Sequence, residues 1–204
     1  MNNIADTDLR PDSTDGIDAL LLRASEVLKN GLPAEGILDS LLCLKKKLAG
    51  INGLITKLTE VAFIRFLNEH DIIDDLTART VIKQQVEASP FSNGYDILIS
   101  NPPIIAEVKC MIPVGKTEFG AAQKNAILAD IEGLINPGPK KNLGDTALYL
   151  KFMVLLQTSD DHRFESSVHS IIQLAEKNKL RVEIFPDSRA QLYSDRVYIV
   201  KIKQ

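Results

Sequence analysis

The sequence predicts an α/β protein with a mixed central sheet, flanked by helices and preceded by N-terminal helices. In the first third of the 204-residue chain, apolar residues recur three and four positions apart, which is helical spacing. Further along, short apolar runs bounded by Pro, Gly and Asn alternate with helical segments, as in a sheet covered by helices. Two of these runs, 95–99 and 104–110, are joined by a turn at 101–103, and so short a connection predicts an antiparallel hairpin.

The N-terminal region is predicted to be helical after a short lead. Residues 1–16 are polar and acidic, with little to bury, and we expect them to be disordered. Residues 17–204 are expected to form one domain, with an N-terminal helical segment over 17–50 and a core over 54–204. Gly50 and Gly53 indicate a break or kink between the two.

The core begins with a helix over 54–68 that is apolar nearly all round, which is typical of a buried helix. After it we expect, in chain order, a helix over 72–86, the hairpin, a helix over 120–135, a strand over 147–158, a helix over 165–178 and strands over 180–185 and 196–202.

Composition excludes several functions. The chain is 45% hydrophobic and 25% charged, the balance of a soluble globular protein, and no apolar run approaches the roughly 20 residues of a membrane span. A net charge of −3 argues against non-specific coating of nucleic acid, but not against a site-specific binder. The polar N-terminus predicts no secretory signal, and two cysteines without CxxC spacing predict neither a disulfide framework nor structural zinc. We therefore expect a cytoplasmic protein, and without a GxxxxGK[ST] motif we expect no nucleotide cofactor.

Charged residues gather on the predicted hairpin. Asp96 begins its first strand, while Glu107 and Lys109 lie two residues apart on its second strand and so share a face. Folding the hairpin brings Asp96 level with Glu107 or its neighbour. Two carboxylates and an ammonium flanked by apolar residues are hard to explain as a solvated surface.

These residue types suit a divalent metal. Mg²⁺ prefers oxygen ligands and takes one or two carboxylates, which Asp96 and Glu107 supply; the Val108 carbonyl is a third candidate ligand. Lys109 is then placed to orient or deprotonate an attacking water, or to hold a phosphate. To act as a base it would need burial and the metal to lower its pKa.

Glu60 is a further candidate. It lies between the directions of two apolar residues on the helix over 54–68, so its carboxylate needs a base or a metal as partner. The alternative is that Glu60 caps a neighbouring group or reaches the surface.

Asp96, ten intervening residues and then Glu107-Val108-Lys109 resemble the catalytic signature of the PD-(D/E)XK nuclease superfamily. The predicted order of elements is similar to that family's core, with one helix inserted after the hairpin. The resemblance implies a restriction-endonuclease-like core, Mg²⁺ with Mn²⁺ as a substitute, Glu60 as a further metal ligand, and Gln123 or Lys124 as supporting residues. The motif's proline is replaced here by Tyr95.

The resemblance implies a Mg²⁺-dependent endonuclease that cuts double-stranded DNA, most like a type II restriction enzyme acting as a homodimer. Lys116, in the loop after the hairpin, is a candidate phosphate contact, although an ordinary surface loop explains it as well. Two alternatives stay open: a structure-selective repair nuclease or resolvase, and a non-catalytic nuclease-like module that binds DNA or a protein.

Overall fold

The computed structural model describes residues 37–87, 94–111, 119–137, 146–157, 161–186 and 192–203. The predicted lead over 1–16 and the first helical turns after it lie outside these residues. The chain divides into two compact units, residues 1–54 and 55–204. No helix among the described residues is long and apolar enough to cross a membrane.

The first described element, α2 (Ile37–Glu69), is one helix of 33 residues. The predicted break at Gly50 and Gly53 is therefore wrong. A glycine costs about 1 kcal/mol relative to alanine inside a helix, but it keeps both main-chain hydrogen-bonding groups, so it weakens a helix without ending it. A Cβ added at either glycine would meet nothing within 4 Å, so close packing does not explain them.

The other predicted elements of the core are present, with bounds shifted by a few residues. They are α3 (Asp75–Glu87), β1 (Ile97–Ile99), β2 (Ile104–Lys109), α4 (Ala121–Ile135), β3 (Leu150–Gln157), α5 (Asp161–Lys177), β4 (Val182–Ile184) and β5 (Val197–Lys203).

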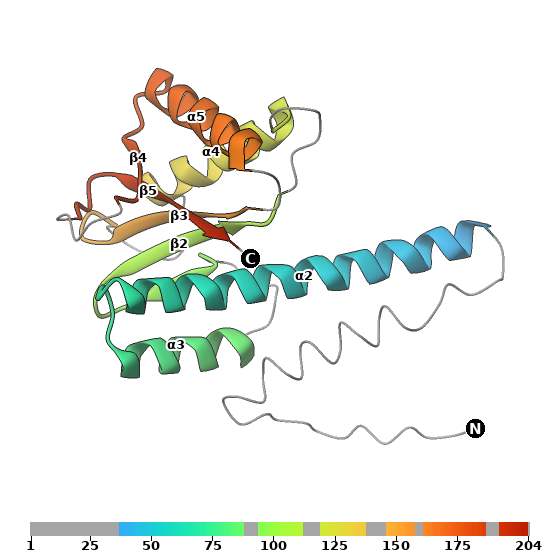
Figure 1. The fold of residues 1–204 in the computed structure, drawn as a ribbon, viewed down its shortest axis with the longest axis horizontal. Coiled ribbons are helices and arrows are strands. Elements are labelled where there is room, and N and C mark those ends of the chain that lie inside the picture. Colours follow the sequence, from blue (N-terminus) through green and yellow to red (C-terminus); the bar gives the residue numbers. More distant parts are fainter. Residues whose placement is uncertain are drawn as a thin grey trace. The chain divides into compact units, whose positions relative to one another are not determined.

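The strands form one mixed sheet in the order β1-β2-β3-β5-β4 (Figure 1). The hairpin prediction is confirmed, because β1 pairs antiparallel with β2 and places Ile97 opposite Ala106. All the other pairs are parallel. The register sets Lys109 of β2 beside Leu155 of β3, and Leu155 beside Lys201 of β5, so these residues form a row across the carboxyl-terminal part of the parallel strands.

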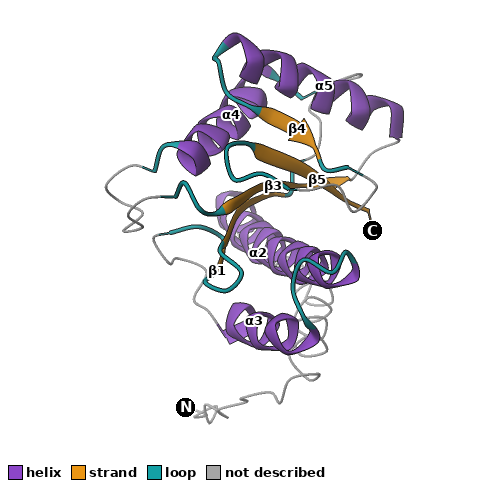
Figure 2. Cartoon of the chain, turned by 90° about the vertical axis from the view of Figure 1, so that its left-hand side faces the viewer, coloured by secondary structure: helices purple, strands orange, loops and turns teal. Residues whose placement is uncertain are grey.

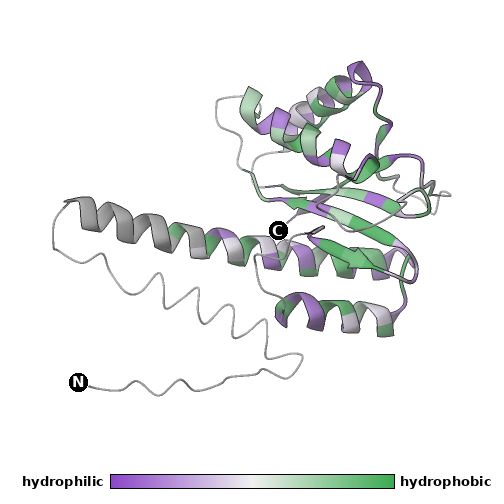
Figure 3. Ribbon diagram, turned by 180° about the vertical axis from the view of Figure 1, so that it is seen from behind, coloured by the Kyte–Doolittle hydropathy of each residue, from purple (hydrophilic) through white to green (hydrophobic). Residues whose placement is uncertain are grey.

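Helices cover both faces of the sheet, and α4 and α5 lie on the face opposite α3 (Figure 2). On one face, α2 residues Phe63, Ile64 and Leu67 are fully buried against β1, β2 and the central strands. Each such side chain contributes about 1.5–3 kcal/mol by leaving water. On the other face, Ile127 and Ile131 of α4 pack with α5 and the opposite side of the same strands. Hydrophobic residues accordingly concentrate in the strands (Figure 3), and the predicted α/β class with a mixed, helix-flanked sheet is confirmed.

Candidate active site at the end of the hairpin

Asp96 lies at the point where β1 begins. Its Oδ2 accepts the main-chain N–H of Val108 at 2.7 Å, just beyond the last paired residues, since Asp96 precedes Ile97 by one position and Val108 follows Ala106 by two. The side chain thus takes the place of a main-chain acceptor in the ladder. Gln85 of α3 donates its Nε2 to the carbonyl oxygen of Asp96 at 2.9 Å, so the residue is held at both its main chain and its side chain.

Glu107 and Lys109 lie on the face of β2 that α4 covers, because they alternate with residues that face α2. Their neighbour Ile105 belongs to the core on the α4 side, whereas Val108 belongs to the core on the α2 side. Glu107 is only 7% exposed. A buried carboxylate two residues from a lysine at the end of a strand is unusual for a purely structural hairpin.

Asp130 joins this group from α4. Its Oδ2 lies 2.7 Å from Nζ of Lys109, and the two side chains are 27% and 26% exposed. Asp130 was not among the residues predicted from the sequence, although the sequence carries a signal for it. At 100° per residue, its direction lies only about 40° from that of Leu134, which is fully buried. A carboxylate so close to the apolar stripe of a helix needs a partner.

The surroundings of Lys109 keep it charged. Burial lowers its pKa, but the close contact with Asp130 and the charges of Asp130, Glu107 and Asp96 outweigh that effect and raise the pKa above its ordinary value. Tyr95, at the position of the motif's proline, is buried, and its hydroxyl donates to the carbonyl of Gly133 at 3.4 Å. Burial first, and then the charge of Glu107, raise the pKa of Tyr95.

Glu60 lies on α2 and is 3% exposed. The partner that its burial required is Lys57, whose Nζ donates to Glu60 Oε2 at 2.9 Å and to Gln85 Oε1 at 3.4 Å. Burial raises the pKa of Glu60, the hydrogen bond and charge of Lys57 oppose the rise, and the charge of Asp96 adds to it. The charge of Asp96 therefore acts on both Glu60 and Lys109.

Cys110 follows Lys109 and links β2 to α2. Its Sγ donates to Thr59 Oγ1 at 3.2 Å. Burial raises the pKa of this thiol, which the Thr59 and Thr56 hydrogen bonds oppose and the charges of Glu60 and Asp96 reinforce. A raised thiol pKa lowers the fraction of reactive thiolate, and the contact with Thr59 indicates a packing role for Cys110. The side chain of Cys43 lies outside the described residues.

The oxygen atoms of a kind that a metal takes are, at this end of the hairpin, the carboxylates of Asp96 and Glu107 and the main-chain carbonyl of Val108. Within the described ranges, no three His, Cys, Asp or Glu side chains come together as a ready-made cage. Mg²⁺ does not need one, because it commonly takes one or two carboxylates and keeps its waters. Since a strand residue directs its N–H and C=O to the same side, the Val108 carbonyl points toward the edge where Asp96 accepts the Val108 N–H.

The supporting residues suggested by the resemblance have other contacts or fall outside the description. Gln123 caps α4, because its Oε1 accepts the main-chain N–H of Gly120 at 3.0 Å. Lys124 is a half-buried residue in the first turn of the same helix. Lys116 lies outside the described residues.

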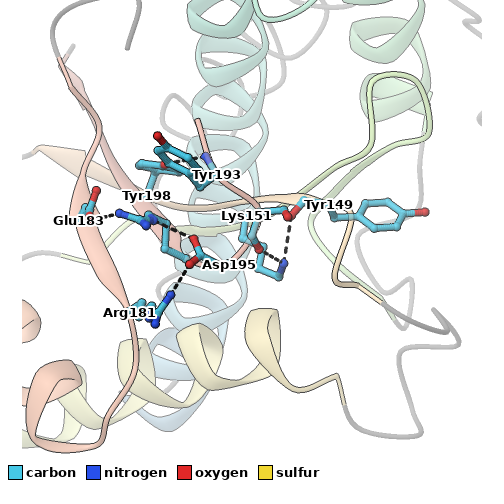
Figure 4. A network of polar contacts seen from close by, with 9 residues as sticks. Tyr149, Lys151, Arg181, Glu183, Tyr193, Asp195 and Tyr198 are labelled. Atoms are coloured by element: carbon cyan, nitrogen blue, oxygen red, sulfur yellow. Dashed lines mark hydrogen bonds and ion pairs between the residues drawn. The ribbon is translucent and has the colours of Figure 1, made fainter. Parts of the chain in front are cut away.

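A second polar cluster lies at the other end of β3 (Figure 4). Lys151 is 3% exposed, and its Nζ donates to the carbonyl oxygens of Thr146, Tyr149 and Ser194 at 2.8, 3.0 and 2.6 Å. These three bonds use the three protons of the ammonium. Lys151 also lines a cavity of about 500 Å³, and its ammonium ties the chain segments before β3 and β5 together.

The fold and the site together define an α/β protein whose mixed sheet carries an acidic cluster with a lysine at the end of an edge hairpin. Comparisons with protein-family models, with curated proteins and with solved structures found no match.

Proposed function

We propose that the protein is a Mg²⁺-dependent endonuclease of the PD-(D/E)XK kind that hydrolyses phosphodiester bonds in double-stranded DNA. The observation that carries the proposal is the joint placement of Asp96, Glu107 and Lys109. Asp96 bonds the main chain of β2 one residue after Glu107, and the charges of both carboxylates act on Lys109. Two carboxylates and one lysine at the end of a hairpin resemble the signature's set, with Asp96 just before β1 and the other two on β2.

The position of the site in the sheet supports this proposal. Ligands of open α/β sheets bind beyond the carboxyl ends of the parallel strands, and Glu107 and Lys109 are among the last residues of β2. From β1 to β4, the order of hairpin, helix, strand, helix and strand is also similar to that of a restriction-endonuclease-like core with one helix inserted after the hairpin, and β5 is additional to it.

The carboxylates of Asp96 and Glu107 and the carbonyl of Val108 would hold the metal. When bound, Mg²⁺ would lower the pKa of a coordinated water and neutralise charge on the phosphate. Glu60 would join this set only by giving up its ion pair with Lys57, so its proposed role as a ligand depends on that exchange.

Lys109 would act as a cation. Its raised pKa keeps it an ammonium, which favours holding the scissile phosphate or orienting the attacking water over removing a proton. We propose first that the protein is a type II restriction enzyme that works as a homodimer. A structure-selective repair nuclease is the second proposal.

A non-catalytic module that binds DNA or a protein is the competing function. One observation favours it: Lys109 and Glu60 each already have a protein partner, Asp130 and Lys57. In that case the cluster would only stabilise the end of the hairpin.

Incubation of the full chain with linear and supercoiled double-stranded DNA separates the two functions. We expect cleavage in Mg²⁺ or Mn²⁺, none in EDTA, and none for Asp96→Asn, whereas Glu132→Gln, an exposed change on α4, should cut normally. Cleavage that persists undiminished in excess EDTA, or an Asp96→Asn protein that cuts at the native rate, would rule out the proposed mechanism.

A further inference from the structure

The pair formed by Lys109 and Asp130 connects the end of β2 with α4. We propose that Asp130 is a positioning residue, which fixes the ammonium of Lys109 beside Glu107 and influences DNA cleavage only through Lys109. This inference rests on the proposed nuclease function and adds to it a residue that the family signature does not contain.

The geometry makes Asp130 a fixed anchor. The helix α4 is held against the sheet by Ile127, Ile131 and Leu134, all fully buried, so the main chain at Asp130 has little freedom. Lys109, by contrast, has four rotatable bonds and stands at the last position of β2. A contact of 2.7 Å between its Nζ and Asp130 Oδ2 selects one of the many directions that this side chain would otherwise sample.

Asp130 also supplies negative charge that Lys109 would need once a metal is bound. In the proposed site, Asp96 and Glu107 are committed to a divalent cation, so their charges no longer compensate the ammonium. Lys109 would then have a like-charged metal as a neighbour, and repulsion would favour an outward position of its side chain. Asp130 approaches from a different element and remains available as the counter-ion that keeps Lys109 in place.

A purely structural role predicts different behaviour. The two side chains of the pair are about a quarter exposed, so solvent screening limits what the pair adds to stability, although Asp130 Oδ2 itself is shielded from water. Loss of the pair should therefore leave stability nearly unchanged, whereas a misplaced catalytic group can cost about a hundredfold in rate. The catalytic and structural readouts are thus separable.

The test is a double-mutant cycle measured by single-turnover DNA cleavage at saturating Mg²⁺. We compare the native chain with Asp130→Asn, Lys109→Ala and the double variant, and use Glu132→Gln on the exposed side of α4 as the matched control. Asp130→Asn should cut at least about tenfold more slowly and Glu132→Gln at the native rate. In the Lys109→Ala background, Asp130→Asn should change the rate less than about twofold, because the group it positions is gone.

Two further measurements complete the test. DNA affinity in Ca²⁺ and the thermal midpoint should be nearly native for Asp130→Asn, and Asp130→Glu, which keeps the charge, should recover part of the lost rate. A native rate for Asp130→Asn overturns the inference, as does an equal loss in the Lys109→Ala background. Both results leave the nuclease proposal standing, whereas a native chain that cuts no DNA in Mg²⁺ or Mn²⁺ overturns the nuclease proposal and this inference together.

Discussion

The carboxylate of Asp96 accepts the main-chain N–H of Val108 at 2.7 Å, at a point where β1 no longer supplies an acceptor of its own. One side chain thereby continues the ladder of the hairpin and directs its charge toward Lys109 and Glu60. The same residue is thus both a structural element of the hairpin and a ligand in the proposed site, and the two roles can be separated by substitution.

Asp96→Asn and Asp96→Ala should differ in stability but not in activity. Asparagine keeps an oxygen that can accept the Val108 N–H, whereas alanine leaves that group without its acceptor, at a cost of about 1–3 kcal/mol. Both variants lose the charge that would bind the metal, so both should fail to cut DNA. Urea unfolding measures the first difference and cleavage assays the second; equal stability of the two variants would contradict the structural role.

Calcium should separate DNA binding from cleavage. Ca²⁺ is an oxygen-ligand cation like Mg²⁺, but it activates water poorly, so it should support DNA binding without product. Fluorescence anisotropy with labelled duplex DNA, in Ca²⁺ and in EDTA, measures this binding. A native chain that binds equally well in both would show that the carboxylates do not hold a metal at the DNA.

Much of the fold could be predicted because its signals are local. The strand at Leu150–Gln157 is an apolar run, and the hairpin is dictated by the short connection before Ile104. The continuous helix through Gly50 and Gly53 was missed because two glycines lower helix propensity without ending a helix. Helix propensity alone does not show whether the helical turns on either side of the two glycines outweigh the free-energy cost of the glycines.

The candidate site was only partly predictable. Asp96, Glu107 and Lys109 are close in sequence and on one hairpin, so strand geometry brings them together. Lys57 lies on α2 itself, three positions before Glu60, a spacing at which side chains of one helix meet. Asp130 and Gln85 come from other helices, 21 and 11 positions from their partners Lys109 and Asp96, and these pairings have no local signal. Their placement depends on how α3 and α4 pack on the sheet, which the apolar pattern specifies by face but not by register.

Glu60 should make stability depend on pH. Burial raises its folded-state pKa above the ordinary 4.5, so between 4.5 and the raised value the folded chain holds a proton that the unfolded chain has lost. The native chain therefore loses stability as pH rises through that window. Glu60→Gln cannot ionise, so its stability relative to the native chain should improve over the same window, while the exposed control Glu69→Gln should show no such trend. Urea unfolding at a series of pH values in EDTA checks this, and parallel curves for all three proteins would contradict it.

Lys151 should matter for stability and not for DNA. Lys151→Met keeps much of the side-chain volume but removes the donor to three main-chain carbonyls in the segments before β3 and β5. The free energy of unfolding should fall by at least about 2 kcal/mol. Lys201→Met removes a single, partly exposed contact with Glu165 and should cost less than about 1 kcal/mol. Denaturant unfolding compares the two. A Lys151→Met protein as stable as the native chain would show that other groups satisfy those carbonyls.

Lys109 offers the sharpest test of the chemistry. If its ammonium only balances nearby carboxylates, Lys109→Ala should mainly alter stability and metal affinity. If it holds the phosphate or the attacking water, the loss should fall on the chemical step, where charge-stabilising groups are typically worth about 10²–10⁴ in rate. We expect Lys109→Ala to fold and to bind DNA in Ca²⁺, but to cut at least about a hundredfold more slowly in single-turnover reactions at saturating Mg²⁺.

The arginine variant sharpens this test. Lys109→Arg keeps the charge, but its planar fork does not reproduce the compact ammonium that meets Asp130 at 2.7 Å, so we expect it to recover little of the rate. Asp96→Ala should also abolish cleavage, but through lost metal, and this difference appears as a lost response to Ca²⁺ in DNA binding. Because the ammonium contacts Asp130 and the charges of Glu107 and Asp96 act on it, its charge alone is not expected to suffice; its position relative to the two proposed metal ligands must also be kept. A Lys109→Ala protein that cuts DNA at the native single-turnover rate would refute the catalytic assignment of Lys109 and leave its pairing with Asp130 as a purely structural contact.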